Sequence, residues 1–189
     1  MYFRSSTKKA VQAACVLLEQ TPSRSMSYLR LLKLLYVADR KAMESVHRPI
    51  IGTRVVAMRN GPLHSEVFNL IKKEHIDEPL WSEFIRKEGY LLTEVKDPGV
   101  SELSRFEISV LTSVSEEFSQ VDDWQLVEHT HCFPEWKKHY PDPAENTSQT
   151  IPLEDILDAL GLAAEKSAIL ADAWEDSRIR SLQAQVSRV

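Results

Sequence analysis

Residues 27–40, SYLRLLKLLYVADR, form the most informative segment of the sequence. Its apolar residues recur on nearly every side of a helix, so we predict a helix over 28–46 at the centre of the domain. Ser27 is the expected N-cap, because its hydroxyl can accept a hydrogen bond from a free N–H of the first turn. Lys33 and Asp39 interrupt this apolar helix. We expect both to pair with polar groups of the same fold, with a bound partner or ligand as the alternative.

The segments on either side of this helix predict more helices and one strand. A first helix should begin at residues 5–7 and end at Pro22, with an apolar face made by Ala10, Ala14, Leu17 and Leu18. Residues 53–58 predict a strand, because valines favour extended backbone. Residues 60–62, Asn-Gly-Pro, predict a turn, with Pro62 as the first residue of a helix that buries Leu63, Val67, Leu70 and Ile71.

The second half of the chain is also mainly helical. Ser104 followed by Glu107 is a capping box, which predicts a helix that buries Phe106, Val110, Val114 and Phe118. A short helix is expected after Pro79, and a hairpin at 89–95. Another helix should begin at a cap, Asp122 or Asp123.

The C-terminal part is a loop followed by two helical segments. The loop covers 138–150, and the next helix, 151–160, should end at Gly161. The predicted fold class is therefore mainly α with minor β (α+β): a compact multi-helix domain with a small β element and a C-terminal helical extension. We expect one domain over 1–162, and a C-terminal helix over 163–189 that is packed or partly free.

Composition favours a globular cytoplasmic protein. Apolar residues make up 43% and charged residues 27% of the 189 residues. No apolar run is long enough to span a bilayer, and the N-terminus has no secretory pattern. The two cysteines, Cys15 and Cys132, lie far apart in sequence, which is no disulfide framework.

The net charge of −5 is unevenly distributed. Residues 1–75 hold 13 Lys/Arg and 5 Asp/Glu, and residues 76–189 hold 10 and 23. One interpretation of this uneven distribution is that the protein has a basic face that binds an acidic partner and an acidic face that binds a basic partner. We prefer the interpretation that the two halves neutralise each other in one compact fold.

Three stretches in this order resemble the SocA-like (Panacea domain) antitoxin family. Residues 27–40 are similar to the family's K-L-L-Y-x-A-D helix, and residues 51–63 to its strand followed by a G-P turn. Residues 130–136, THCFPEW, are similar to its T-H-x-x-P-x-W signature. The resemblance covers nearly the whole chain, and its ordered set of motifs is far more specific than any one of them.

The resemblance implies a bacterial or prophage antitoxin that neutralises a protein toxin, encoded nearby, by direct contact. It implies no enzymatic activity, cofactor or metal. We expect the motif residues to build the scaffold: Lys33, Tyr36, Asp39, Gly61, Pro62, Thr130, His131, Pro134 and Trp136. Neutralisation would occur by occlusion of the toxin or by its delivery to a cellular protease.

Three chemical alternatives compete with this scaffold interpretation. His129, His131 and Cys132 could supply metal ligands, but structural zinc needs four, so we prefer a histidine that anchors the loop before Trp136. A cysteine nucleophile would need a positioned base and an oxyanion site, and no such signature is present. The turn at 60–62 could hold a phosphate, but it lacks the glycines and the lysine of a phosphate loop.

Direct DNA binding is the alternative function, as an autoregulator of the operon. The two N-terminal helices could form a helix-turn-helix, and residues 1–75 are basic. The link between these helices is too long, however, and the second helix is apolar where base-reading residues should be exposed. We therefore rank nucleic acid below a protein partner.

Specificity for one toxin should lie on exposed segments. The candidates are the 138–150 loop, the acidic late helices and the basic pair before residue 75. Among the tryptophans, we expect Trp136 in the core and prefer Trp174 to Trp124 as an interface anchor. The named partner-binding candidates are Lys72, Lys73, Glu154, Asp155, Asp158 and Trp174.

Overall fold

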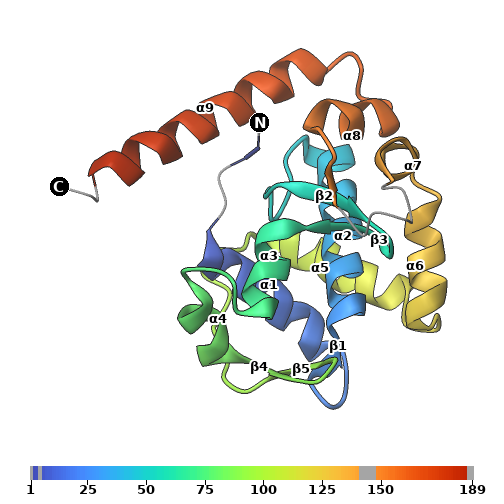
Figure 1. The fold of residues 1–189 in the computed structure, drawn as a ribbon, viewed down its shortest axis with the longest axis vertical. Helices are drawn as coiled ribbons and strands as arrows, with labels where there is room; N and C mark the ends of the chain where they lie inside the picture. The colour runs from blue at the N-terminus through green and yellow to red at the C-terminus, as the bar shows by residue number, and fades with distance from the viewer. Residues whose placement is uncertain (1, 4–5, 141–147, 187–189) are drawn as a thin grey trace.

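The organising element of the fold is the helix α2, Tyr28–Val46. The structure, a computed structural model, describes residues 2–3, 6–140 and 148–186. Helix α2 runs through the body and is surrounded by other elements (Figure 1). The Ser27 hydroxyl accepts a hydrogen bond from Arg30 N at 3.0 Å, so the predicted cap is confirmed. Eleven residues from Leu31 to Met43 are buried, which confirms the central position of this helix.

The helices α1, Thr7–Glu19, and α5, Arg105–Glu117, pack against α2 and share its core. Every residue from Ala10 to Leu18 is buried, so α1 is enclosed on more than the one face expected. The capping box of Ser104 and Glu107 forms as predicted.

The buried face of α5 differs from the predicted one at Phe106. This ring is 37% exposed, whereas Leu111 and Val114 are fully buried. At about 100° per residue, Phe106 lies about 140° around the helix from Leu111. The expectation that Phe106 is a core residue was therefore wrong.

A three-stranded antiparallel sheet, in the order β3-β2-β6, covers one side of α2. Its strands are β2, Val55–Met58, β3, Gly61–His64, and β6, Gln149–Thr150. Pro62 pairs with Ala57 in β3 and does not begin a helix, which corrects the prediction. A proline fits here because β3 is an edge strand and needs no hydrogen bond from every N–H. The following helix, α3, is Ser65–Lys72.

A second antiparallel sheet has the order β1-β5-β4. The hairpin predicted at 89–95 is present but begins at residue 85: its strands are β4, Ile85–Glu88, and β5, Leu91–Glu94. Gly89 in its turn has a φ of +58°. Strand β1, Ser25–Ser27, pairs with β5 and leads directly into α2. The short helix α4, Glu78–Phe84, directly precedes β4.

Four further helices complete the described part of the chain: α6, Asp123–His131, α7, Pro134–His139, α8, Leu153–Ala159, and α9, Lys166–Val186. A second capping box, Asp122 with Gln125, begins α6. The predicted 138–150 loop is shorter than expected, because α7 extends to 139 and β6 occupies 149–150; its residues 141–147 lie outside the described residues.

Helix α9 is attached to the body through a small apolar cluster and extends beyond it at its C-terminal end (Figure 1). Ile169 and Ala173 of α9 are buried in this cluster with Phe3, Met43 and two leucines of α8, Leu153 and Leu157. The result is a helix-dominated α+β fold. The division of the chain at residue 162 remains a prediction.

The uneven charge of the sequence is largely neutralised within the fold. Many basic residues of the first 75 positions form ion pairs with acidic residues of the later part: Lys8–Glu102, Lys9–Glu107, Arg24–Glu94, Arg30–Asp123, Arg40–Glu135, Lys41–Glu117, Arg48–Asp176 and Lys73–Glu78. This confirms the preferred interpretation of the charge. None of the described helices is long and apolar enough to cross a membrane.

Candidate functional site

The three motifs meet around Lys33. Its side chain is 1% exposed, and Nζ donates a hydrogen bond to Pro62 O at 2.8 Å. Burial lowers the pKa of Lys33 to about 7. Gly61 beside it has a φ of +94°, and a Cβ there would lie 2.5 Å from Thr130 Oγ1. Only glycine therefore fits where the β2–β3 turn crosses α2 and α6.

Tyr36, one turn along α2, connects this helix to α7. Its hydroxyl donates to Glu135 Oε1 at 2.7 Å, and Arg40 forms an ion pair with the same carboxylate. The Glu135 side chain is fully buried. Burial, followed by the negative charge of Glu135, raises the pKa of Tyr36. Sequence analysis assigned no role to Glu135, although an acidic residue directly after Pro134 suits the first turn of a helix.

Trp136 fixes α7 to the sheet. Its indole is 7% exposed, and Nε1 donates to Met58 O at 3.0 Å, so Trp136 is a core residue as predicted. The His131 ring stacks on the indole, with ring centroids 4.0 Å apart and planes 8° apart. Burial lowers the pKa of His131. These contacts hold α6 and α7 together, and Pro134 begins α7.

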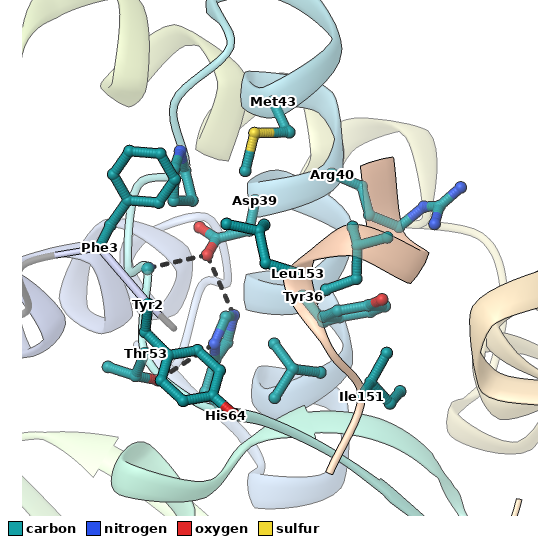
Figure 2. A pocket seen from close by; sticks show the side chains of 14 residues that line it. Tyr2, Phe3, Tyr36, Asp39, Arg40, Met43, Thr53, His64, Ile151 and Leu153 are labelled. Atoms are coloured by element: carbon teal, nitrogen blue, oxygen red, sulfur yellow. Dashed lines mark hydrogen bonds and ion pairs between the residues drawn. The ribbon is translucent and has the colours of Figure 1, made fainter. Parts of the chain in front are cut away.

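Asp39 holds the chain between α2 and β2. Its carboxylate accepts backbone hydrogen bonds from Ile50 and Ile51 at 2.9 and 2.8 Å, and from Gly52 at 3.0 Å. His64 Nε2 lies 3.3 Å from Asp39 Oδ2, and His64 Nδ1 lies 3.2 Å from Thr53 Oγ1 (Figure 2). The Asp39 carboxylate therefore finds its partners inside the fold.

The line of Asp39, His64 and Thr53 has the residue types of a catalytic relay, but its surroundings suit a packed core. All three side chains are almost fully buried. The adjoining cavity, shown in Figure 2, has a volume of about 30 Å³ and a mainly apolar lining. That volume is room for about two water molecules. Burial lowers the pKa of His64, so the ring is neutral at pH 7 despite the nearby carboxylate.

The motif geometry agrees with a comparison to known families. The chain matches the family model of the antitoxin SocA-like, Panacea domain over residues 31–137, which is more than half of its 189 residues. The chain belongs to the SocA-like, Panacea domain family. No curated protein and no solved structure matches it. The matched region contains Lys33, Gly61, Thr130 and Trp136, whose contacts hold the SocA-like core together.

The histidines of the third motif do not gather around a metal position in the SocA-like domain. Among the described residues, one group of side chains has spacing that could hold an ion: Glu19, Glu94 and Asp97. The Arg24 guanidinium pairs with two of these carboxylates. His131 lies against Trp136 instead.

The nucleic-acid alternatives find little support in the SocA-like fold. The Asn60-Gly61-Pro62 turn joins two strands and does not precede a helix N-terminus, so it is no phosphate loop. Helices α1 and α2 bury most of their residues, and neither presents a free face that could enter a DNA groove.

The partner-binding candidates fall in two separate regions. Lys72 and Lys73 lie at the end of α3 and pair with Glu74 and Glu78. The other candidates belong to α8 and α9. Of these, Asp155 pairs with Lys138 and His139, and Asp158 with Lys166; Glu154 is partly buried, and Trp174 is 51% exposed. The structure therefore does not unite the predicted candidates in one surface.

Asp155, one of the partner-binding candidates, pairs with two residues of α7. Hydrogen bonds from Lys138 and then His139 lower the pKa of Asp155, so this carboxylate ties α8 to α7.

The exposed tryptophans are the better interface candidates. Trp124 is 64% exposed, more than the preferred Trp174, which lies under the guanidinium of Arg178.

Proposed function

We propose that this SocA-like protein is an antitoxin that binds a protein toxin directly and covers a surface that the toxin needs. The observation that supports this is the family match, combined with the burial of the motif side chains. Lys33, Tyr36, Asp39 and Trp136 are all buried and engaged within the fold. Binding must therefore use the outer surface, and the motifs keep that surface in shape.

A complex of this kind has a characteristic size. A stable protein–protein interface buries on the order of 1,600 Å² in total, usually around a few aromatic or arginine residues. The described part of the chain exposes several such side chains, including Tyr90, Trp124 and Trp174. A preformed helical body that presents them loses little conformational freedom on binding.

Co-expression with the adjacent gene tests the proposal. The neighbouring protein, induced alone, should stop bacterial growth, and induction of this chain alongside it should restore growth. The two purified proteins should also elute together in size-exclusion chromatography. A neighbour that is harmless alone, or that remains lethal in the presence of this chain, would refute the antitoxin function.

Occlusion and delivery to a protease are separate modes within this proposal. We favour occlusion, because the described domain is compact and its core contacts need no partner. Depletion of the major cytoplasmic proteases in the co-expression strain separates the two modes. Protection should persist under occlusion, and it should disappear under delivery.

The proposal includes a cytoplasmic location and no enzymatic step. Cys15, which is buried, and Cys132, which is exposed, are both free cysteines. The Asp39–His64–Thr53 line adjoins a cavity too small for a substrate. Most basic residues of the first 75 positions pair with acidic ones, which counts against DNA binding as an alternative.

A further inference from the structure

An open groove lies on the described surface, and surface residues of the first two motif stretches form part of its lining. It is formed where the start of α2, the turns of the two hairpins and the start of α6 come together, and its volume is about 460 Å³. Its lining consists of Ser27, Tyr28, Leu29, Asn60, Tyr90, Asp123 and Trp124. No segment of the described chain fills it.

The groove exposes aromatic surface that a monomer alone would not need. Tyr90 is 77% exposed and Trp124 is 64% exposed, and the rings of Tyr28 and Tyr90 stack with centroids 5.7 Å apart. Tyrosine and tryptophan are the residues most enriched at the energetic centres of protein interfaces. Their rings carry much apolar area on two side-chain torsions, so fixing them on binding costs little entropy.

The walls of the groove are held in place by hydrogen bonds. Tyr28 N donates to Tyr90 O at 2.9 Å, which fixes the hairpin turn against α2. The Ser27 hydroxyl donates to the Asp123 carboxylate, and Arg30 also reaches that carboxylate, at 3.5 Å. The binding surface is therefore preorganised, and a ligand need not order it.

The charges at the rim indicate what kind of ligand the groove fits. Lys87 Nζ lies 5.5 Å from the centroid of the Tyr28 ring, and Arg59 is exposed beside Asn60. Neither forms an ion pair within the described residues. The one carboxylate of the lining, Asp123, is already engaged by Ser27 and Arg30. Lys87, which lies over a ring of the lining, and Arg59, next in sequence to the lining residue Asn60, thus supply positive charge for a negatively charged ligand.

We propose that this groove, which we call the aromatic groove, receives a short acidic segment of the toxin. A large apolar side chain of that segment inserts between Tyr90 and Trp124, and carboxylates on either side of it pair with Lys87 and Arg59. This inference rests on the proposed antitoxin function and names its contact surface. Single-stranded nucleic acid is the competing ligand, but it needs a continuous basic track, and two cations do not make one.

The test compares matched surface variants of the full chain. The probe is the purified protein encoded by the adjacent gene, and its dissociation constant is measured by isothermal titration calorimetry. Tyr90→Ala combined with Trp124→Ala should weaken binding by about 30-fold or more. Lys87→Glu should also weaken toxin binding, and by a larger factor at low salt than at high salt. Ile76→Ala, at a 91% exposed site outside the groove, is the control and should bind like the wild type.

The outcomes separate this inference from the proposed function. Unchanged thermal unfolding of each variant shows that the fold is intact, as expected for exposed side chains. If wild type and groove variants bind the toxin equally, the groove assignment is wrong and the antitoxin function stands. If the wild type binds no toxin, both proposals fail. Binding of a single-stranded oligonucleotide that is lost in Trp124→Ala would replace the toxin segment with nucleic acid.

Discussion

At the scale of single residues, the main feature of the protein is that its charged motif residues are buried. Sequence reasoning predicted that Lys33 and Asp39 pair within the fold. It could not predict the partners, because Pro62 O and the backbone N–H groups of residues 50–52 reach them only after the chain folds back. Lys33 in particular has a neutral acceptor, not an acidic one, which makes it sensitive to pH.

We predict that the stability of the protein rises between pH 7 and pH 9 because of Lys33. Burial lowers the pKa of this amine to about 7, while in the unfolded chain it is about 10.4. Over this interval the unfolded state therefore binds more protons, and the free energy of unfolding rises by up to about 1.4 kcal/mol per pH unit. Urea denaturation at a series of pH values measures this free energy of unfolding.

The matched variants for this prediction are Lys33→Met and Lys8→Met. Lys33→Met removes the titrating group, so its stability should rise less with pH than that of the wild type. Lys8 is exposed, so Lys8→Met should keep the wild-type slope. Equal slopes for wild type and Lys33→Met would mean that the buried amine is not the cause.

Gly61 is the residue where substitution should cost most for its size. Gly61→Ala places a Cβ 2.5 Å from Thr130 Oγ1 at a φ of +94°, and should lower the free energy of unfolding by about 3 kcal/mol. Gly99→Ala is the control, since its φ is +64° and nothing lies within 4 Å of the new Cβ. It should lose only about 1 kcal/mol. Chemical denaturation measures the free energy of unfolding of both variants. Similar losses in the two would contradict the close approach of the Gly61 backbone to Thr130.

At the scale of elements, prediction succeeded where the signal is local. The caps at Ser27 and Ser104 depend on residues within three positions, and both were found. The role of Pro62 was missed, because it depends on pairing with Ala57 across a hairpin. The aromatic groove was missed for the same reason: Tyr90 and Trp124 meet only through the tertiary fold.

Helix α9 should separate from the body when its buried face is disrupted. Ala173 is completely buried, and Ala173→Asp would place a charge in the small apolar cluster. We expect faster hydrogen exchange over residues 166–179, with exchange in α2 unchanged. Ala171→Asp, two residues away at an exposed position, is the control. Slow exchange of α9 in Ala173→Asp would show that this cluster does not hold the helix.

At the scale of the whole molecule, opposite charges join the two halves of the chain. Residues 1–75 have an excess of eight positive charges, but basic residues such as Lys9, Arg30 and Arg40 face acidic partners from the second half. The fold class could be predicted from the sequence because it follows from helical periodicity. The surface that binds a partner could not be, since exposure is a property of the folded molecule.

We expect no binding of the operon's own promoter DNA at 150 mM salt. The basic residues are neutralised by ion pairs, so few are free to displace counterions from a duplex. Electrophoretic mobility shift with pure protein measures this. A shift that weakens steeply as salt increases would instead make the protein a DNA-binding regulator and would reverse the ranking of the two functions.

The contact of Phe3 with α9 has a consequence for how the protein is made. Phe3 is buried against Ile169 and Ala173, residues that a ribosome adds about 170 positions later. At a synthesis rate of about 5–20 residues per second, this aromatic ring waits roughly 8 to 34 seconds for its neighbours. Throughout that delay the nascent chain keeps an apolar site open, and a chaperone has time to occupy it.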